Sequence, residues 1–131
     1  MSETQIKSSK ALNGKKILVV EDELPLAHAL KLKFSLYGFE VDTATNGKEG
    51  LEMALNNKYD AILLDLIMPH MDGFTFLEEL KSKKVKTPIL VLSNLGQAED
   101  KERAKQLGAV NYYVKSNTPI AEIITAVHSQ L

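Results

Sequence analysis

The sequence predicts an α/β fold of the (βα)5 type, in which five parallel strands alternate with helices. Five short apolar runs are each followed by a polar break and a longer stretch of helical character, which is the sequence form of βα units. Three of the runs are rich in Val, Ile and Leu without alternation, as is typical of strands covered by helices on both faces. The predicted strands are 17–20, 39–43, 61–64, 89–92 and 112–114, and the second alternates in the manner of an edge strand.

Capping residues mark the ends of several helices. Gly38 and Gly108 follow apolar helical stretches and are expected to end the first and fourth helices in a left-handed conformation. The last helix is expected to begin with Thr118 as its N-cap and Pro119 at its first helical position. Apolar residues at helical spacing form the expected buried face of the first helix (Leu26, Ala27, Leu30, Phe34) and of the last (Ile120, Ile123, Ile124, Val127).

Length and composition are those of one globular domain. The chain has 131 residues, of which 44% are hydrophobic and 25% charged. Residues 1–13 are polar and show no apolar period, so we expect a flexible N-terminal tail followed by a folded domain at 14–131. The chain has no cysteine, no apolar stretch long enough to cross a membrane, and no apolar signal-peptide core at its N-terminus. We therefore expect a cytoplasmic protein.

The charges are balanced. Sixteen Lys plus Arg against seventeen Asp plus Glu give a net charge of −1, which offers no electrostatic basis for non-specific nucleic-acid binding. We expect neither direct nucleic-acid binding nor membrane association by this chain. Any specificity must come from a local site.

Polar residues follow four of the predicted strands. The first strand ends in Glu21 and Asp22, the third in Asp65, the fourth in Ser93 and the fifth in Lys115. Right-handed crossovers place the carboxyl ends of parallel strands at one edge of the sheet, where ligands of such folds bind. Each residue has an ordinary explanation when taken alone, such as a solvated turn, a helix cap or a surface lysine. Their convergence is what points to a site.

The joint pattern predicts a metal-assisted phosphoryl site. Three carboxylates at one apolar sheet edge repel one another unless a cation or a proton is present. Oxygen ligands select a hard cation, and a site of a few carboxylates plus waters suits Mg²⁺. Lys115 and Ser93 on the adjacent strands would supply a positive charge and a hydrogen-bond donor to a phosphoryl group. One carboxylate would be the acceptor.

Asp65 is the best candidate for the acceptor. It ends the central third strand and is followed by the loop 66–73, which is long enough to turn a backbone carbonyl toward a metal. Glu21 and Asp22 lie on the neighbouring first strand. We therefore predict that Asp65 is the nucleophile and that Glu21 and Asp22 are metal ligands.

From Lys16 to Leu131 the chain resembles the receiver domain of bacterial two-component response regulators, the CheY-like superfamily. The matching segments are KKILVVEDE, YDAILLDLIMPHMDGFTFLEEL, TPILVLSN and LGAVNYYVK, and DLIMPHMDGF is the most specific part. The resemblance implies a doubly wound, flavodoxin-like three-layer sandwich with strand order 2-1-3-4-5. It also implies a phosphoacceptor that assists its own phosphorylation and dephosphorylation but is not a turnover enzyme.

The resemblance also assigns the site residues. It implies that Asp65 is phosphorylated by a phosphohistidine on a sensor histidine kinase or a phosphotransfer protein. Mg²⁺ would be bound by Asp22, Asp65 and the backbone carbonyl of Ile67, with Glu21 reaching it through water. The cofactor implied is therefore Mg²⁺.

A switch is implied in the same way. Lys115 would pair with the phosphoryl group, Ser93 would hydrogen-bond to it, and Tyr112 would move inward as Ser93 is drawn to the phosphate. A downstream effector protein or domain would then read the face formed by the fourth helix, the fifth strand and the fifth helix. We expect a monomer or a weak, phosphorylation-dependent dimer.

Two residues depart from the usual receiver pattern. Ser116 follows Lys115, where the family usually has a proline held in a cis peptide bond, so we expect either a trans bond in a reshaped loop or a strained bond. Asn94 follows Ser93, where a small residue is common. Ile67 and Leu95, each two positions after a site residue, are apolar and predict slow self-dephosphorylation by shielding the acyl phosphate from water.

Three other functions share part of this residue pattern. Phosphatases with an aspartyl nucleophile commonly carry a second Asp two positions on, where this chain has Ile67. A flavin or nucleotide module would want a Gly- or Ser-rich turn after the first strand, where this chain has EDELP. The remaining alternative is a pseudo-receiver, a binding module of the same fold that switches without phosphate, and Ser116 and Asn94 are the changes that would allow it.

Overall fold

The structure, a computed structural model, describes residues 14–131, and the predicted tail at 1–13 lies outside the described residues. Within them every predicted strand is confirmed, with ends that differ by at most one residue. The elements are β1 (Lys16–Val20), α2 (Leu24–Leu36), β2 (Glu40–Ala44), α3 (Gly47–Asn56), β3 (Ala61–Leu64), α4 (Gly73–Ser82), β4 (Ile89–Ser93), α5 (Ala98–Gln106), β5 (Asn111–Val114), the 3₁₀ turn η2 (Lys115–Asn117) and α6 (Ile120–His128).

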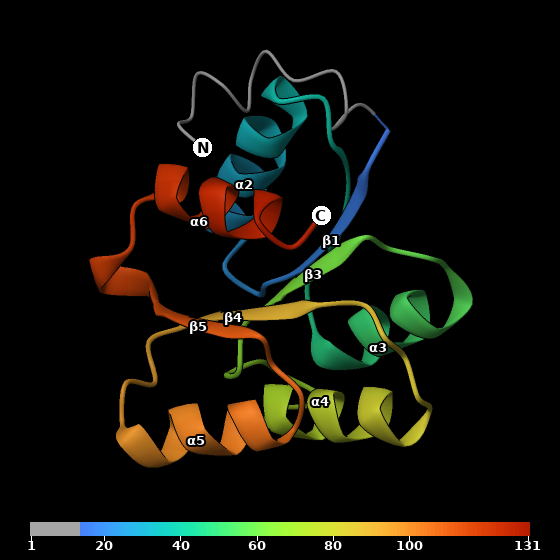
Figure 1. Ribbon diagram of the computed structural model, residues 1–131, viewed down its shortest axis with the longest axis vertical. Helices are drawn as coiled ribbons and strands as arrows, with labels where there is room; N and C mark the ends of the chain where they lie inside the picture. The colour runs from blue at the N-terminus through green and yellow to red at the C-terminus, as the bar shows by residue number, and fades with distance from the viewer. Residues whose placement is uncertain (1–13) are drawn as a thin grey trace.

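The five strands form one parallel sheet in the order β2-β1-β3-β4-β5, as expected. Helices α2 and α6 cover one face of the sheet, and α3, α4 and α5 cover the other (Figure 1). The strand order changes direction at β1, which pairs with β2 on one side and β3 on the other. This three-layer arrangement confirms the predicted doubly wound fold.

The core consists of two layers separated by the sheet. Successive residues of a strand point to opposite faces, so Ile17 and Val19 of β1 pack toward α2 and α6, whereas Leu18 and Val20 pack toward α3, α4 and α5. Strands β1, β3 and β4 are almost wholly buried, as their unbroken apolar runs indicated. Strand β2 lies at the edge of the sheet, and only Val41 and Ala44 of its five residues are buried.

The helix ends agree with the sequence at two glycines and differ at the last helix. Gly38 and Gly108 have φ values of 90° and 105°, as expected of left-handed helix stops. The prediction for Thr118 was wrong by one residue: Pro119 is the N-cap and α6 begins at Ile120. The Thr118 hydroxyl is used elsewhere, since it donates a hydrogen bond to the Val114 carbonyl at 2.8 Å.

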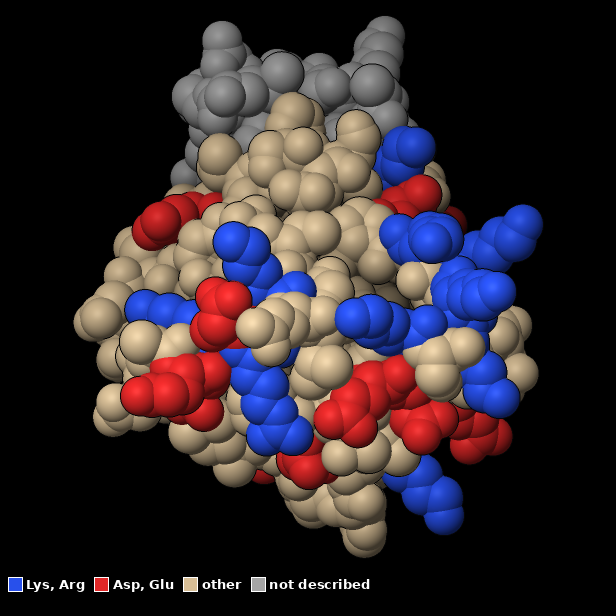
Figure 2. Space-filling model, turned by 60° about the horizontal axis from the view of Figure 1, so that its bottom comes forward, with Lys and Arg blue, Asp and Glu red and all other residues tan. Residues whose placement is uncertain are grey.

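The surface around α4 and α5 carries charges of both signs. Figure 2 shows Lys and Arg side chains interspersed with Asp and Glu on this side of the molecule. Arg103 of α5 and Glu78 of α4 form one such pair, with 3.7 Å between Nη2 and Oε1. No helix within residues 14–131 is long and apolar enough to span a membrane.

Candidate metal and phosphoryl site

Asp65 follows β3 at the centre of the sheet edge and is only 4% exposed. Its backbone N–H donates to the Val20 carbonyl at 3.0 Å, which extends the pairing of β3 with β1 by one residue. One carboxylate oxygen accepts the backbone N–H of Ile67 at 3.2 Å, and the other lies 3.0 Å from Lys115 Nζ. Burial and these two donors hold the Asp65 side chain in one orientation.

The loop after Asp65 turns sharply before α4 begins. The N–H of Gly73 donates to the Leu66 carbonyl at 2.8 Å, and Asp72 caps α4 by accepting the Thr75 N–H at 3.0 Å. A Cβ atom at Gly73 would lie 2.6 Å from Leu66 Cα and 2.8 Å from the Asp65 carbonyl oxygen. These contacts explain the Asp-Gly pair of the DLIMPHMDGF segment. Asp72 caps α4, and position 73 must be glycine because a side chain there would collide with the backbone of Asp65 and Leu66.

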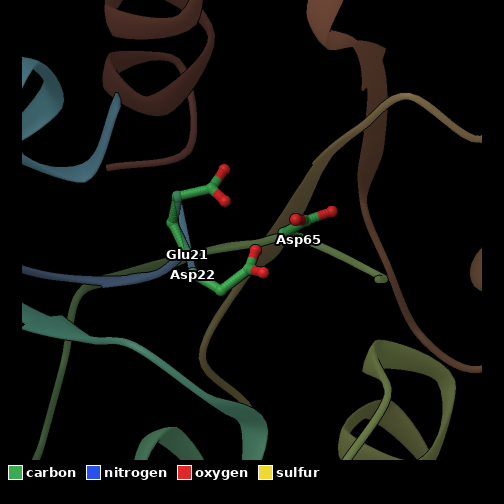
Figure 3. Close-up of side chains that lie close together, drawn as sticks. All are labelled: Glu21, Asp22 and Asp65. Carbon is green, nitrogen blue, oxygen red and sulfur yellow. The ribbon is translucent and has the colours of Figure 1, made fainter. Parts of the chain in front are cut away.

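Glu21 and Asp22 follow β1 and meet Asp65 across the sheet edge. One carboxylate oxygen of each of the three residues lies within 4.8 Å of the others, and Figure 3 shows the three side chains extending from neighbouring strand ends. Glu21 is 2% exposed, and its backbone N–H donates to the Ala44 carbonyl at 2.9 Å. A set of hard oxygen donors at this separation fits Mg²⁺.

Lys115 joins the carboxylates from the other side of the sheet edge. Its Nζ lies 2.7 Å from Glu21 Oε1, 3.0 Å from Asp65 Oδ2 and 2.5 Å from Glu23 Oε2. The backbone N–H of Glu23 also donates to Glu21 Oε2 at 3.1 Å. Glu23 was not among the predicted site residues, although it is the third acidic residue of the EDE run. Three carboxylates thus contact one ammonium group.

The pKa values of Glu21 and Lys115 are both raised, which favours the neutral form of Glu21 and the charged form of Lys115. Burial raises the pKa of Glu21 to about 7, while the hydrogen bonds from Lys115 and from the Glu23 N–H act against this shift. Burial alone would lower the pKa of Lys115, but its hydrogen bonds to Glu21, Glu23 and Asp65 outweigh that effect and raise it. Lys115 therefore stays charged across the physiological range, whereas the raised pKa of Glu21 lies near neutral pH.

A cavity of about 210 Å³ opens beside the carboxylates. Asp65 and Asp22 line it together with Ile67 of the β3–α4 loop, whose side chain is 54% exposed. Glu23, Asn94 and Lys115 complete the lining. The cavity brings together the segments that follow β1, β3, β4 and β5, as the prediction from strand ends required.

Ser93 and Tyr112 both contact the backbone of Leu95. Ser93 is fully buried, and its Oγ accepts the Leu95 N–H at 3.4 Å. The Tyr112 hydroxyl donates to the Leu95 carbonyl. Burial raises the pKa of Tyr112 to about 12, so this hydroxyl remains protonated and able to donate. In this structure the cavity is lined by Asn94, the residue next to Ser93.

The sequence left open whether the Lys115–Ser116 peptide bond is trans in a reshaped loop or strained, and the structure answers this question. Residues 14–131 contain no cis peptide bond, so this bond is trans. Lys115, Ser116 and Asn117 form the 3₁₀ turn η2. The backbone N–H of Ser116 donates to Asn94 Oδ1 at 3.2 Å, so the two residues that depart from the receiver pattern are in contact.

Comparison with known proteins agrees with this geometry. Residues 17–128 match the family model described as the response regulator receiver domain. The cell cycle response regulator CtrA of Brucella ovis is 38% identical over 114 residues, which are 87% of this chain and 49% of that protein. The chain thus spans about half the length of the curated relatives it matches.

Solved structures show the same relationship. The receiver domain of the Francisella response regulator 1452 superposes with a TM-score of 0.85 at 33% identity, covering 89% of this chain and 96% of that one. The response regulator TrrA of Thermotoga maritima, solved in complex with Mg²⁺-BeF, superposes with a TM-score of 0.78 at 32% identity, covering 89% and 99%. By sequence and fold, this chain belongs to the response regulator receiver domain family of two-component systems.

Proposed function

We propose that this chain is a phosphoacceptor that takes a phosphoryl group onto Asp65 with the help of Mg²⁺. The observation that carries the proposal is the placement of the Asp65 carboxylate, which is buried, held by Lys115, and within 4.8 Å of ligand oxygens of Glu21 and Asp22. The combination suits a carboxylate that must meet an anionic group next to a cation.

The transfer would proceed by in-line displacement at phosphorus. An Asp65 carboxylate oxygen forms the new O–P bond while the N–P bond to the donor's phosphohistidine breaks, and the imidazole leaves with the electron pair. The Lys115 ammonium, 3.0 Å from Asp65, would balance the charge on the equatorial phosphoryl oxygens. Mg²⁺, held by Asp22, Asp65 and the Ile67 carbonyl with Glu21 through water, would supply further positive charge there. The protein is a transfer partner and not a turnover enzyme.

The readout would pass through the Leu95 backbone. Drawing the Ser93 hydroxyl toward the phosphoryl group breaks its contact with the Leu95 N–H and shifts the carbonyl to which Tyr112 donates. Tyr112 also lines a groove of about 700 Å³ between α5 and β5. The phosphoryl group thus favours one of two arrangements of this face by its differential contacts, which is a population shift.

The partners follow from this chemistry. A sensor histidine kinase or a phosphotransfer protein would donate the phosphoryl group, and an effector protein or domain would bind the α5, β5 and α6 face. We place the chain in the cytoplasm as a monomer or a weak, phosphorylation-dependent dimer, without direct nucleic-acid or membrane contact. The TrrA complex with Mg²⁺-BeF supports the assignment of Mg²⁺, because beryllofluoride resembles a phosphoryl group bound to a carboxylate.

Mass spectrometry tests the proposal. The protein is incubated with acetyl phosphate or phosphoramidate and Mg²⁺, and its mass is compared with that of Asp65→Asn treated in the same way. A gain of one phosphoryl group in the wild type and none in the variant is expected. No gain in the wild type would instead favour the phosphate-independent pseudo-receiver, which the assembled site disfavours.

A further inference from the structure

A side-chain hydrogen bond links two of the loops that flank Asp65. Asn94, the first residue after β4, accepts the backbone N–H of Ser116 through its Oδ1 at 3.2 Å. Ser116 belongs to the turn η2, which begins at Lys115. Asn94 and Lys115 line the cavity beside Asp65, and both line a neighbouring hollow with Ser116. The contact therefore lies at the rim of the candidate site.

The Ser116 N–H finds its acceptor outside the turn. The first N–H groups of a helical turn have no partner within the turn, and η2 is only three residues long. Asn94 supplies the acceptor for Ser116. At the start of the same turn, the Val114 carbonyl accepts the Thr118 hydroxyl at 2.8 Å. Two side chains thus hold the turn that carries Lys115.

The two departures from the receiver pattern compensate for each other. A proline at position 116 has no N–H to satisfy, and an alanine or glycine at position 94 has no side-chain acceptor to offer. In this chain Ser116 provides the donor and Asn94 the acceptor, and the peptide between Lys115 and Ser116 is trans. The pair fixes by a hydrogen bond a loop that a proline ring would otherwise constrain.

We propose that Asn94 is a positioning residue for Lys115. The side-chain amide of Asn94 holds the Lys115–Ser116 peptide so that Lys115 Nζ reaches Asp65. Because Asn94 directly follows Ser93, a shift of Ser93 also moves the loop that carries Lys115. The inference deepens the proposed phosphoacceptor function and rests on it. Within residues 14–131 the side-chain hydrogen bond of Asn94 is to Ser116 and not to Asp65, so its effect on the site passes through the turn that carries Lys115.

A double-mutant cycle with two readouts tests the inference. The variants are Asn94→Ala, Ser116→Pro and the double variant, with Asn117→Ala as a matched control because Asn117 is an exposed residue of the same turn. The first readout is hydrogen exchange of the Ser116 amide measured by NMR, which needs no phosphoryl group. The second is the affinity for beryllofluoride in the presence of Mg²⁺.

The expected results are specific to the contact. Asn94→Ala should speed exchange of the Ser116 amide and weaken beryllofluoride binding by about three- to tenfold, the usual contribution of one hydrogen bond. Asn94→Asp keeps the acceptor oxygen and should keep the amide protected. In the Ser116→Pro background, Asn94→Ala should leave the affinity unchanged, because the donor is already gone. Asn117→Ala should behave as the wild type.

Two results would overturn the inference alone while wild-type binding stands. One is an unchanged Ser116 exchange rate in Asn94→Ala. The other is an equal loss of affinity from Asn94→Ala in both backgrounds, which would mean that Asn94 acts without Ser116. If the wild type does not bind beryllofluoride, the proposed function and the inference are both wrong. Circular dichroism of each variant confirms that the comparison is between folded proteins.

Discussion

The Tyr112 hydroxyl donates a hydrogen bond to the backbone carbonyl of Leu95. The N–H of the same residue donates to Ser93, which is fully buried at the end of β4. Leu95 therefore connects the two residues expected to form the switch, and it does so through backbone atoms. The side chain at position 95 contributes nothing to these two bonds, so any residue other than proline could form the link.

Tyr112→Phe should shift the protein toward the state that binds a phosphoryl group. The hydroxyl bond stabilises only the arrangement seen here, so its loss should lower the free energy of unfolding by about 1 kcal/mol and raise beryllofluoride affinity severalfold. Urea unfolding and a beryllofluoride titration with Mg²⁺ measure the two effects. Tyr113→Phe is the matched control, since that ring packs toward α2 and α6 on the other face. A Tyr112→Phe affinity equal to that of the wild type would contradict the switch.

Glu23→Gln should strengthen binding of a phosphoryl analogue. Glu23 Oε2 lies 2.5 Å from Lys115 Nζ, but its side chain is 56% exposed and free to leave. Its charge competes with an incoming anion for Lys115, so neutralising it should raise beryllofluoride affinity severalfold, and more at low salt than at high salt. Glu52→Gln, an exposed carboxylate of α3, is the control. A loss of affinity in Glu23→Gln would show that Glu23 orients Lys115 and does not compete with the anion.

Mg²⁺ affinity should fall as the pH drops through about 7, the raised pKa of Glu21. A protonated carboxyl is a poor partner for a cation, so proton uptake opposes metal binding. Without Mg²⁺ the stability changes in the opposite sense. Between the usual pKa of 4.5 and about 7 the folded chain holds a proton that the unfolded chain has released, so the free energy of unfolding falls as pH rises through this window.

Glu21→Gln isolates this group. The variant should lose most of the pH dependence of Mg²⁺ binding near neutral pH, measured by isothermal titration, and the matching slope in urea unfolding without metal. Glu52→Gln again serves as the control. Equal pH profiles for the wild type and Glu21→Gln would place the titration on another residue.

The fold was predictable because its signals are local. Apolar runs such as Ala61–Leu64 are buried on both faces, and their ends coincide with the ends of the strands. Because the carboxyl ends of parallel strands share one sheet edge, Glu21, Asp22, Asp65 and Lys115 are predicted to lie close together. In the structure one oxygen of each of the three carboxylates lies within 4.8 Å of the others, and Lys115 contacts Glu21 and Asp65. These residues were found because each directly follows a strand.

The contacts that the sequence did not reveal join loops distant in the chain. Glu23 and Lys115 are 92 positions apart, and Asn94 and Ser116 are 22 apart. No apolar period or capping motif predicts such pairs, because the three-dimensional path of each loop decides which side chains meet. Thr118 was misassigned for a related reason: its hydroxyl has two possible partners, and the Val114 carbonyl at the end of β5 takes it.

Gly73→Ala should destabilise the protein by roughly 1–3 kcal/mol. The added Cβ would lie within 2.8 Å of backbone atoms of Asp65 and Leu66, which have no room to yield because both residues are buried. Gly96→Ala is the matched control, since its Cβ would meet only Val114 Cγ2 at 3.8 Å. Urea unfolding compares the two variants. Equal stabilities would mean that the β3–α4 loop is free to shift, and the tight turn after Asp65 would then need another explanation.

The acyl phosphate on Asp65 should be long-lived, and Ile67 should be the main reason. The Ile67 side chain lines the cavity with Asp22 and Asp65, whereas Leu95 packs partly against the core on the α3, α4 and α5 face. Ile67→Asn would offer an attacking water a hydrogen-bond partner and should shorten the phosphate lifetime roughly tenfold, while Ile67→Val keeps an apolar shield and should change it little. The lifetime is measured as phosphate release after the phosphodonor is removed. A wild-type lifetime of seconds would contradict the prediction that the acyl phosphate is shielded from water. Equal lifetimes in Ile67→Asn and Ile67→Val would mean that access of water to this cavity does not limit hydrolysis.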